Sequence, residues 1–569
     1  MLFLPLATSL FCFAVSALAD NSTILSSEID VFVNDLLAEW NSPGGVAVAV
    51  VRMDGQGSWL VETKGYGTAT TNGSKVTPDT IFSVGSNSKL FDVLATGLLI
   101  SNESLSPQIS WNTKLASLIP SWKLVDPVAT SESTITDLMS HRIGLPSHDF
   151  GYFRYNDSVP ALVERMQYLK PSAPFRWAFQ YTNMMYAILS YLPTVLLPDK
   201  PSFVRYITDN IISPLGLNST TYSYAVANAT GRMANGFARE ATTANPLDAG
   251  IPHALPWFFG NTGEPEVGDT FSGPGGVLTT AVDAARWLQM LLSNGLHPDT
   301  NATVVPASVI ETVGTGVSVT LGNPQWPELS PAVYGGGLIQ WSYRGYDMVE
   351  HNGAVPGFFA QITRLPEDGA GVAVFTNEDL GEFTSYIIKY RIIDAILGMD
   401  PVDWDSRYKA EVQQAASAVA GLVPGPPNAS LPFELAAAQG NYRNLGYGPD
   451  ITLCAPSAGS SNCTALLATL NNTFPEELAQ ADLIWAWDTI IATYVLLKHF
   501  DGALFNVTAF VPEPTANASS PFWAYSSGLE GNVAEFELTN DTISGFGIRG
   551  RNMGRWGYDR RATRPYCRG

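Results

Sequence analysis

A serine and a lysine three residues apart, Ser86 and Lys89, close the run at residues 80–89 and constrain the local fold more than any other feature. One turn of helix would place the hydroxyl and the amine on the same face. A free serine hydroxyl is a poor nucleophile, but an amine held against it in a water-poor site can lose its own proton and take that of the hydroxyl. This spacing is expected about once by chance in a serine-rich chain of this length, so a solvated helix start is the alternative interpretation.

A second polar group stands at the start of an apolar segment. Tyr181, Thr182 and Asn183 open residues 181–192, which predict a helix entered from the proline-bearing stretch at 171–174. A phenol at the mouth of a helix can relay protons once a neighbouring ammonium lowers its pKa from about 10, and an amide can donate to and accept from a substrate. Taken alone, Tyr181 would be interpreted as core packing.

A third group lies at residues 350–354, which read Glu-His-Asn-Gly-Ala, and residues 371–377 beyond it predict a buried strand. Gly353 would let the backbone come close to a bound acyl group. His351 has a second interpretation, a hydrogen-bonded strand histidine that takes no part in chemistry.

The three patterns Ser-x-x-Lys, Tyr-x-Asn and His-x-Gly, in this order, resemble the superfamily of penicillin-binding proteins and class C-like β-lactamases, including its esterase and peptidase branches. Residues 82–90, 135–146 and 272–286 are similar to further stretches of that superfamily. The resemblance covers roughly residues 27–395. It implies an α+β fold in which an antiparallel sheet is flanked by helices and accompanied by an all-helical region.

The resemblance also implies roles for individual residues. Ser86 would be the acylated nucleophile, Lys89 and Tyr181 the proton-transfer pair, and Asn183 a group that orients the substrate. Which member of the pair is the base in each half-reaction cannot be read from the sequence, since the two would titrate together.

The third pattern would complete the site. His351 and Gly353 would line the substrate position, and the backbone N–H groups of Ser86 and Ala354 would form an oxyanion hole. Dedicated β-lactamases of the superfamily usually carry lysine where His351 stands. Because a histidine is only partly charged at neutral pH, we expect weaker carboxylate recognition, which argues against a specialised antibiotic-destroying enzyme and leaves slow β-lactam turnover open.

Composition favours an enzyme with large cores. The chain has 569 residues, of which 46% are hydrophobic, and a formal net charge of −21, which argues against nucleic acid or an anionic membrane as partner. We expect no metal, because the spacing of His141, His148 and Asp149 matches no helical ligand pair. We expect no cofactor, because the glycines at 273–276 lack a phosphate-binding pattern. The aromatic stretch at 256–259 would line an acyl pocket or pack in the core.

The N-terminus predicts export. Residues 1–19 are apolar and end in Ala-Leu-Ala, typical of a signal peptide cleaved before Asp20, with a membrane anchor as the alternative. Of the cysteines that would remain, Cys454 and Cys463 are close enough to form a disulfide, and Cys567 is left odd. Dense glycosylation sequons favour a eukaryotic secreted glycoprotein. The sequon asparagines are Asn21, Asn72, Asn102, Asn156, Asn218, Asn228, Asn301, Asn428, Asn462, Asn471, Asn506, Asn517 and Asn540.

The pattern changes after residue 400. We expect a hydrolase domain at 20–400, a helical and proline-rich linker at 401–432, and a small β domain at 433–569 with short strands near 483–487, 503–511, 522–525 and 533–538. Several relatives in the superfamily carry a similar C-terminal domain, sometimes called lipocalin-like. Its role would be to cover the cleft, to bind substrate or to stabilise the fold.

The sequence therefore predicts a secreted serine hydrolase that cleaves a small ester or amide through an acyl-enzyme on Ser86. An acyltransferase of secondary metabolism would use the same intermediate, and a catalytically silent binding protein would keep only the fold. The three residues Ser86, Lys89 and Tyr181 argue against the silent protein, because a scaffold has no need of all of them. The oligomeric state is not indicated.

Overall fold

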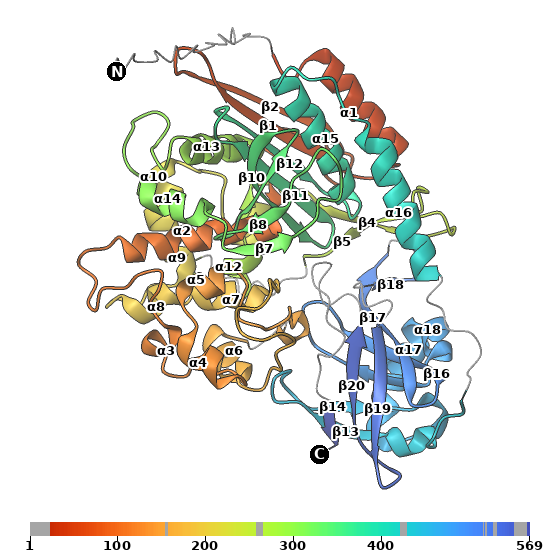
Figure 1. Cartoon of the computed structure of the whole chain (residues 1–569). Coiled ribbons are helices and arrows are strands. Elements are labelled where there is room, and N and C mark those ends of the chain that lie inside the picture. The colour runs from red at the N-terminus through yellow and green to blue at the C-terminus, as the bar shows by residue number, and fades with distance from the viewer. Residues whose placement is uncertain are drawn as a thin grey trace, which may run out of the picture.

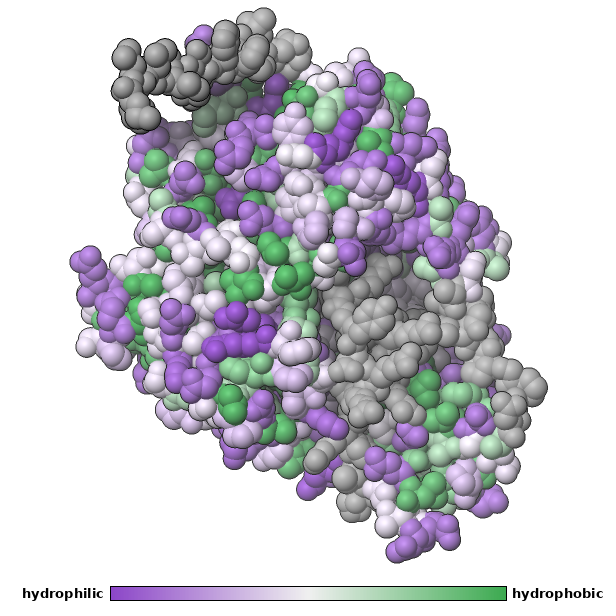
Figure 2. All heavy atoms as spheres, viewed as in Figure 1, coloured by the Kyte–Doolittle hydropathy of each residue, from purple (hydrophilic) through white to green (hydrophobic). Residues whose placement is uncertain are grey.

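The computed structural model describes residues 23–153, 157–257, 266–420, 429–515, 517, 520–526, 532–550 and 566–568. Two large antiparallel sheets dominate it, one in the first 400 residues and one near the C-terminus (Figure 1). In the view of Figure 2, hydrophilic residues cover much of the visible face and hydrophobic residues form only small groups. No helix in the described ranges has the length and apolar character needed to cross a membrane.

The first sheet joins segments that are distant in sequence. Its strand order is β2-β1-β12-β11-β10-β9-β8-β7, so the first strands of the chain pair with strands that come some 300 residues later. Alternate residues of β1 face opposite cores, as the period of a strand requires. The strands are β1 (Gly45–Met53), β2 (Trp59–Gly67), β7 (Ser318–Leu321), β8 (Ala332–Tyr334), β9 (Ile339–Tyr343), β10 (Tyr346–Val355), β11 (Phe358–Leu365) and β12 (Ala370–Thr376).

Helices cover both faces of this sheet (Figure 1). One face carries α1 (Ser27–Glu39), α15 (Gly381–Ile396) and α16 (Trp404–Ala420), and the other carries α2 (Ser88–Ile100) and α13 (Ala281–Leu292). Helix α16 falls within the stretch expected to be a linker, yet Trp404 is buried in the core under α15. The domain boundaries at residues 400 and 432 stay predictions.

A mainly helical region packs around α2 on the side away from the sheet. Its helix α7 (Asn183–Leu189) begins at Asn183, as expected for a helix entered from 181–183, and α5 (Ile135–Met139) starts with a capping box between Thr134 and Asp137. The other helices here are α3 (Leu115–Leu118), α4 (Pro127–Glu132), α6 (Val159–Met166), α8 (Leu192–Leu196), α9 (Phe203–Ile207), α10 (Ser213–Leu215), α11 (Tyr224–Ala229), α12 (Ser272–Gly275) and α14 (Ala307–Gly314). Two small ribbons pair β3 (Phe82–Ser83) with β6 (Leu278–Thr279) and β4 (Gly236–Glu240) with β5 (Ile251–Leu255). The predicted α+β fold is confirmed.

The C-terminal sheet curls until its end strands meet. Its order is β14-β13-β21-β20-β19-β17-β16-β15, with β18 on β17, and Cys454 and Ile484 exchange two backbone hydrogen bonds of 2.8 Å that join β14 to β15. The predicted β-rich C-terminus is confirmed. The strands are β13 (Gly440–Arg443), β14 (Ile451–Leu453), β15 (Leu483–Ala486), β16 (Tyr494–Asp501), β17 (Leu504–Pro514), β18 (Phe522–Ser526), β19 (Asn532–Thr539), β20 (Thr542–Gly550) and β21 (Tyr566–Arg568), and the helices are α17 (Thr464–Thr473) and α18 (Pro475–Gln480).

The expected disulfide between Cys454 and Cys463 is present in this half, where it ties β14 to the turn before α17. Ten of the thirteen sequon asparagines lie in the described residues, and all of them are exposed or half-buried. Asn21, Asn156, Asn428 and the leader at 1–19 lie outside the described residues, as does the side chain of Cys567.

Candidate active site

Ser86 lies in a tight turn that leads into α2. Residues Gly85–Asn87 form a single 3₁₀ turn, and Gly85 has a φ of +48°, a conformation that side chains strain to adopt. The Ser88 hydroxyl fixes this turn, because it donates to the Gly85 carbonyl at 2.6 Å and accepts the Val277 N–H at 2.9 Å. The turn and the first turn of α2 together present Ser86 and Lys89 on one side.

Two side chains donate hydrogen bonds to the Ser86 hydroxyl oxygen. The Lys89 amine lies 2.9 Å from it and the Tyr181 phenol lies 2.7 Å from it. The Lys89 amine also donates to Asn183 Oδ1 at 2.7 Å and to the Pro274 carbonyl at 2.9 Å. The structure thus brings together the four side chains that the sequence singled out in the first two patterns. The contact with Pro274, in α12, was missed, since a backbone carbonyl leaves no signal in sequence.

Burial sets the charge of Lys89. Its side chain has no solvent-exposed surface, and this desolvation lowers the pKa of the amine to about 7, while the carboxyls of Asp149 and Asp92 oppose the shift. A neutral amine can donate to Asn183 and Pro274 and accept the Ser86 hydroxyl proton with its lone pair. This geometry therefore suits a lysine that acts as a base near neutral pH.

The pKa of Tyr181 moves in the opposite direction to the one expected. An ammonium neighbour was expected to lower it, but burial raises the pKa of the phenol above its usual value and outweighs the hydrogen bond to Ser86. The phenol is therefore a proton donor at neutral pH, and Lys89 is the better base of the two.

Two buried carboxyls next to Lys89 were missed as site residues. Asp149 accepts a 3.1 Å hydrogen bond from the Asn183 amide, and burial raises the pKa of this carboxyl to about 6. Asp92, one helical turn beyond Lys89, is fully buried, has no hydrogen-bond partner among the described residues, and has a raised pKa for the same reason. In the sequence, Asp149 stands out only as a candidate metal ligand, because its contact with Asn183 joins residues 34 positions apart.

His351 is buried in β10 and engaged on both ring nitrogens. Nε2 lies 2.9 Å from the Tyr334 hydroxyl, and Nδ1 contacts the Asn352 carbonyl. Burial lowers the pKa of the imidazole to about 3, so the ring is neutral at neutral pH, and the expected partial charge is wrong. The ring centre lies 6.3 Å from that of Tyr181. A neutral, hydrogen-bonded imidazole offers no charge to a substrate carboxylate.

Strand β10 comes against the nucleophile turn at Gly353. A Cβ atom on Gly353 would lie 1.9 Å from the Val84 carbonyl oxygen and 2.7 Å from the Ser86 nitrogen. A Cβ on Gly85 would in turn lie 2.7 Å from the Ala354 nitrogen. Only glycines allow this approach, and it places the backbone nitrogens of residues 86 and 354 at neighbouring positions.

A buried ion pair anchors β10 beside the site. The Glu350 carboxylate lies 3.0 Å from the Lys389 amine of α15, and neither side chain is more than 3% exposed. The same carboxylate accepts hydrogen bonds from Trp341, at 3.0 Å, and from Gln361, at 2.7 Å. This network fixes the strand immediately before His351.

His141 and His148, which the sequence offers as candidate metal ligands, contact other side chains and the backbone. His141 Nδ1 accepts the Thr182 N–H at 3.2 Å and the ring lies 4.4 Å from that of Tyr181, so His141 packs behind the phenol. His148 Nδ1 lies 2.5 Å from the Tyr447 hydroxyl of the C-terminal half. Within the described part of the chain, no group of three or more His, Cys, Asp or Glu residues is placed to hold a metal ion.

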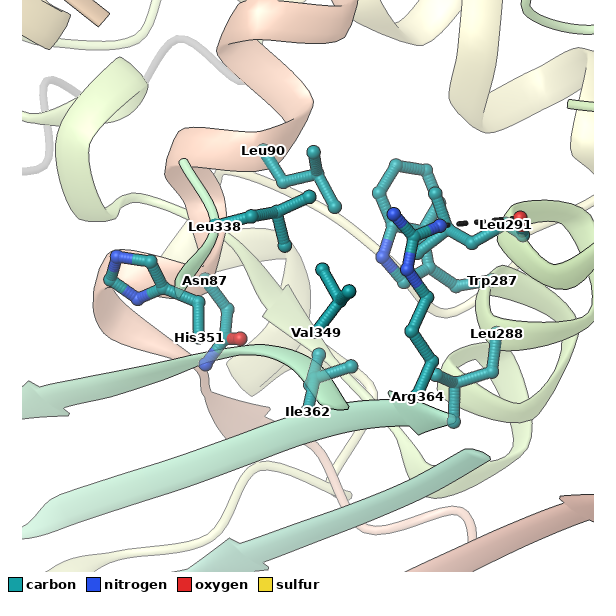
Figure 3. Close-up of a pocket in the computed structure, with 10 residues that line it drawn as sticks. All are labelled: Asn87, Leu90, Trp287, Leu288, Leu291, Leu338, Val349, His351, Ile362 and Arg364. Atoms are coloured by element: carbon teal, nitrogen blue, oxygen red, sulfur yellow. Dashed lines mark hydrogen bonds between the residues drawn. The ribbon is translucent and has the colours of Figure 1, made fainter. Parts of the chain in front are cut away.

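A small cavity lies behind His351 (Figure 3). Its volume of about 10 Å³ suits roughly one water molecule, so it is too small for a substrate. Arg364 borders it beside Trp287 and donates to the Leu291 carbonyl at 3.2 Å, and burial lowers the pKa of this guanidinium to about 10.

The fold and the Ser-Lys-Tyr cluster define a serine hydrolase, and comparison with known proteins identifies its family. A β-lactamase family profile matches residues 35–395, and the chain belongs to this family. The chain is 30% identical over 464 residues to unguisins hydrolase ungD of Aspergillus violaceofuscus, a match that covers 76% of this chain and 77% of the relative.

Solved structures share the fold at lower identity. The octameric penicillin-binding protein homologue from Pyrococcus abyssi is 17% identical with a TM-score of 0.50, and the match covers 92% of this chain and 98% of that one. D-amino acid amidase from Ochrobactrum anthropi SV3 is also 17% identical with a TM-score of 0.50, over 66% of this chain and 99% of that one. At these identities the likeness concerns the fold alone.

Proposed function

We propose that the protein hydrolyses an ester or amide through an acyl-enzyme on Ser86. The observation that carries the proposal is the partly buried contact of the Ser86 hydroxyl with the Lys89 amine, at 2.9 Å, and with the Tyr181 phenol, at 2.7 Å. A nucleophile within hydrogen-bond reach of a base, with the base oriented by further groups, is the arrangement that acyl transfer needs. The 30% identity to an unguisins hydrolase supports hydrolysis over transfer to another acceptor.

The proposed reaction begins when neutral Lys89 takes the Ser86 proton as the hydroxyl oxygen bonds to the substrate carbonyl carbon. The N–H groups of Ser86 and Ala354 would hold the resulting oxyanion. The proton passes from Lys89 through Tyr181 to the leaving group as its bond to carbon breaks. Water then attacks the acyl-enzyme, gives its proton to the same base, and releases the acid with Ser86 protonated again.

Asn183 would hold the Lys89 amine in position through its Oδ1 atom. Its side-chain NH₂ group, which also donates to Asp149, would donate a second hydrogen bond to the substrate. His351 would act through its neutral ring, and Gly353 through its missing side chain, which lets the two proposed oxyanion donors approach one another. None of these proposed roles uses a metal or a cofactor.

Labelling followed by intact-mass spectrometry tests the proposal. The deglycosylated protein is treated with a fluorophosphonate probe and with p-nitrophenyl esters, beside Ser86→Ala and the exposed-site control Ser101→Ala. We expect one adduct on the wild type and on the control, and none on Ser86→Ala. Equal labelling of all three, or no labelling of the wild type, would favour a binding protein that keeps only the fold.

The protein is also proposed to be secreted after cleavage before Asp20. The disulfide between Cys454 and Cys463 and the exposed sequons support an oxidising, glycosylating route. N-terminal sequencing of the protein from culture medium, with and without removal of N-glycans, tests this. A mature chain that begins at Met1 and carries no glycan would contradict it.

A further inference from the structure

A cleft of about 410 Å³ lies where the two sheets approach each other, and both halves of the chain line it. The first half contributes Ala354 and Val355 at the end of β10, and Phe359 at the start of β11. The C-terminal half contributes Ile491, from the loop between β15 and β16, and Val511 from β17. This volume lies in the range typical of pockets for small organic ligands.

The cleft opens next to the proposed oxyanion hole. Ala354 is exposed to it, whereas Gly353, one residue earlier, packs against the Ser86 turn. A leaving group has to face the proton donor Tyr181, which lies on the helical side of Ser86. The rest of the acyl group must then continue away from Tyr181, along the end of β10 and toward the cleft.

The C-terminal half also contacts the other side of the site. Trp487 stacks on Phe150 with ring centres 5.0 Å apart, and the Ile490 N–H donates to the Tyr152 carbonyl at 3.2 Å. These contacts hold the segment that begins with Asp149, the partner of Asn183. One loop of the C-terminal sheet, residues 487–491, therefore packs on the active-site region and lines the cleft.

The described residues that line the cleft include acidic side chains but no basic ones. Among its described lining residues, three are carboxylates, namely Asp379, Glu382 and Glu513, and none is a lysine, arginine or histidine. Asp379 is accessible from the cleft, accepts the Gly357 N–H at 2.8 Å and accepts the Tyr525 hydroxyl of β18 at 3.2 Å. Desolvation raises the pKa of the Asp379 carboxyl to about 6, against the hydrogen bonds from Gly357 and Tyr525, and a bound cation would favour its charged form.

We propose that this cleft is the acyl subsite of the enzyme, completed by the C-terminal sheet, and that it takes an apolar acyl chain ending in an amine. The inference rests on the proposed acyl-enzyme function. Phe359, Ile491 and Val511 would bury the chain, and Asp379, at the cleft edge, would meet its ammonium. A carboxylate at the same position would be repelled.

The test compares p-nitrophenyl esters of equal chain length that end in an ammonium, a methyl or a carboxylate group, together with the acetyl ester. We expect kcat/KM to be highest for the ammonium ester, lower for the methyl ester and lowest for the carboxylate ester. The ammonium ester should be favoured over the carboxylate ester by about tenfold or more. In Asp379→Asn this preference should shrink at least about fivefold, since one charge of the pair is lost.

Ile491→Trp tests the apolar wall independently. The added bulk should lower the ratio of kcat/KM for the methyl-ended ester to that for the acetyl ester by about tenfold. The matched control Val319→Trp, at a residue 61% exposed on the distant strand β7, should keep the wild-type ratio.

Fluorophosphonate labelling of Ser86 is measured on every variant, so failure of the proposed function is distinguishable from failure of the subsite. No labelling of the wild type would overturn the function itself. Normal labelling with unchanged substrate ratios in both Asp379→Asn and Ile491→Trp, or a wild-type preference for the carboxylate ester, would overturn the subsite. Since the two variants alter different halves of the chain, misfolding of one leaves the other to decide.

Discussion

Removal of the Asp149 charge should move the pH at which the enzyme becomes reactive. In Asp149→Asn the side chain keeps its size and can still bond to the Asn183 amide, but the negative charge that raises the pKa of Lys89 is gone. If neutral Lys89 is the base, the rate of Ser86 acylation rises with pH as this amine loses its proton, at a pKa of about 7 in the wild type.

The size of the shift follows from the path between the two charges. Hydrogen bonds of 2.7 Å and 3.1 Å on either side of the Asn183 amide separate the Lys89 nitrogen from the Asp149 oxygen. With the width of the amide added, the separation is roughly 8 Å at most. At an effective dielectric constant of about 20, charges at that distance interact by about 2 kcal/mol, or ~1.5 pKa units. Loss of a negative charge favours the neutral amine. The rising limb of the pH–rate profile, where the acylation rate increases as Lys89 loses its proton, should therefore move toward lower pH by about one unit or more.

The rate constant of fluorophosphonate labelling, followed by intact mass between about pH 5 and pH 9, measures this limb. The control Asp347→Asn removes an exposed carboxylate from β10 and should leave the limb in place. A limb that stays where it is in Asp149→Asn, or that moves to higher pH, would refute Lys89 as the base under the control of Asp149.

Three further outcomes are expected. Gly353→Ala puts a methyl group 1.9 Å from a backbone carbonyl, so Ser86 labelling should slow by about a hundredfold or more, with the fold checked by circular dichroism. Lys389→Met leaves the buried Glu350 carboxylate without its cation and should lower the free energy of unfolding in urea by about 3–5 kcal/mol. The control Lys64→Met breaks the half-exposed pair with Asp30 and should cost less than about 1 kcal/mol. Cys454→Ser opens a loop whose ends are nine residues apart and should cost roughly 2–3 kcal/mol, seen as a lower melting temperature; an unchanged value in any of these assays would contradict the corresponding argument.

Local patterns were enough to predict much of the fold. The buried strand expected at 371–377 is β12, and the strands expected near 483, 503, 522 and 533 are β15, β17, β18 and β19. Each has a local pattern of apolar residues bounded by turns. The pairing of β1 with β12, and the joining of β14 to β15, were not predicted because strands so far apart in sequence carry no local record of their partners.

The candidate site follows the same rule. Ser86 and Lys89 are three residues apart, so a helical turn alone predicts that they meet. The contacts of Lys89 with Pro274 and of Asn183 with Asp149 depend on how the helices pack, and neither was predicted. The assigned roles of these residues stay proposals until labelling tests them.

The charges of the site were the least predictable property, because they depend on burial. Sequence alone suggested a phenol made more acidic by an ammonium and a histidine that is partly charged. Burial instead raises the pKa of Tyr181, lowers that of His351 to about 3, and brings that of Lys89 to about 7. A charged amine would lower the pKa of the phenol, but the Lys89 amine is only about half charged at pH 7, and burial of the phenol raises its pKa. The same desolvation that lets Lys89 act as a base therefore keeps Tyr181 protonated, and the division of labour between them follows from packing.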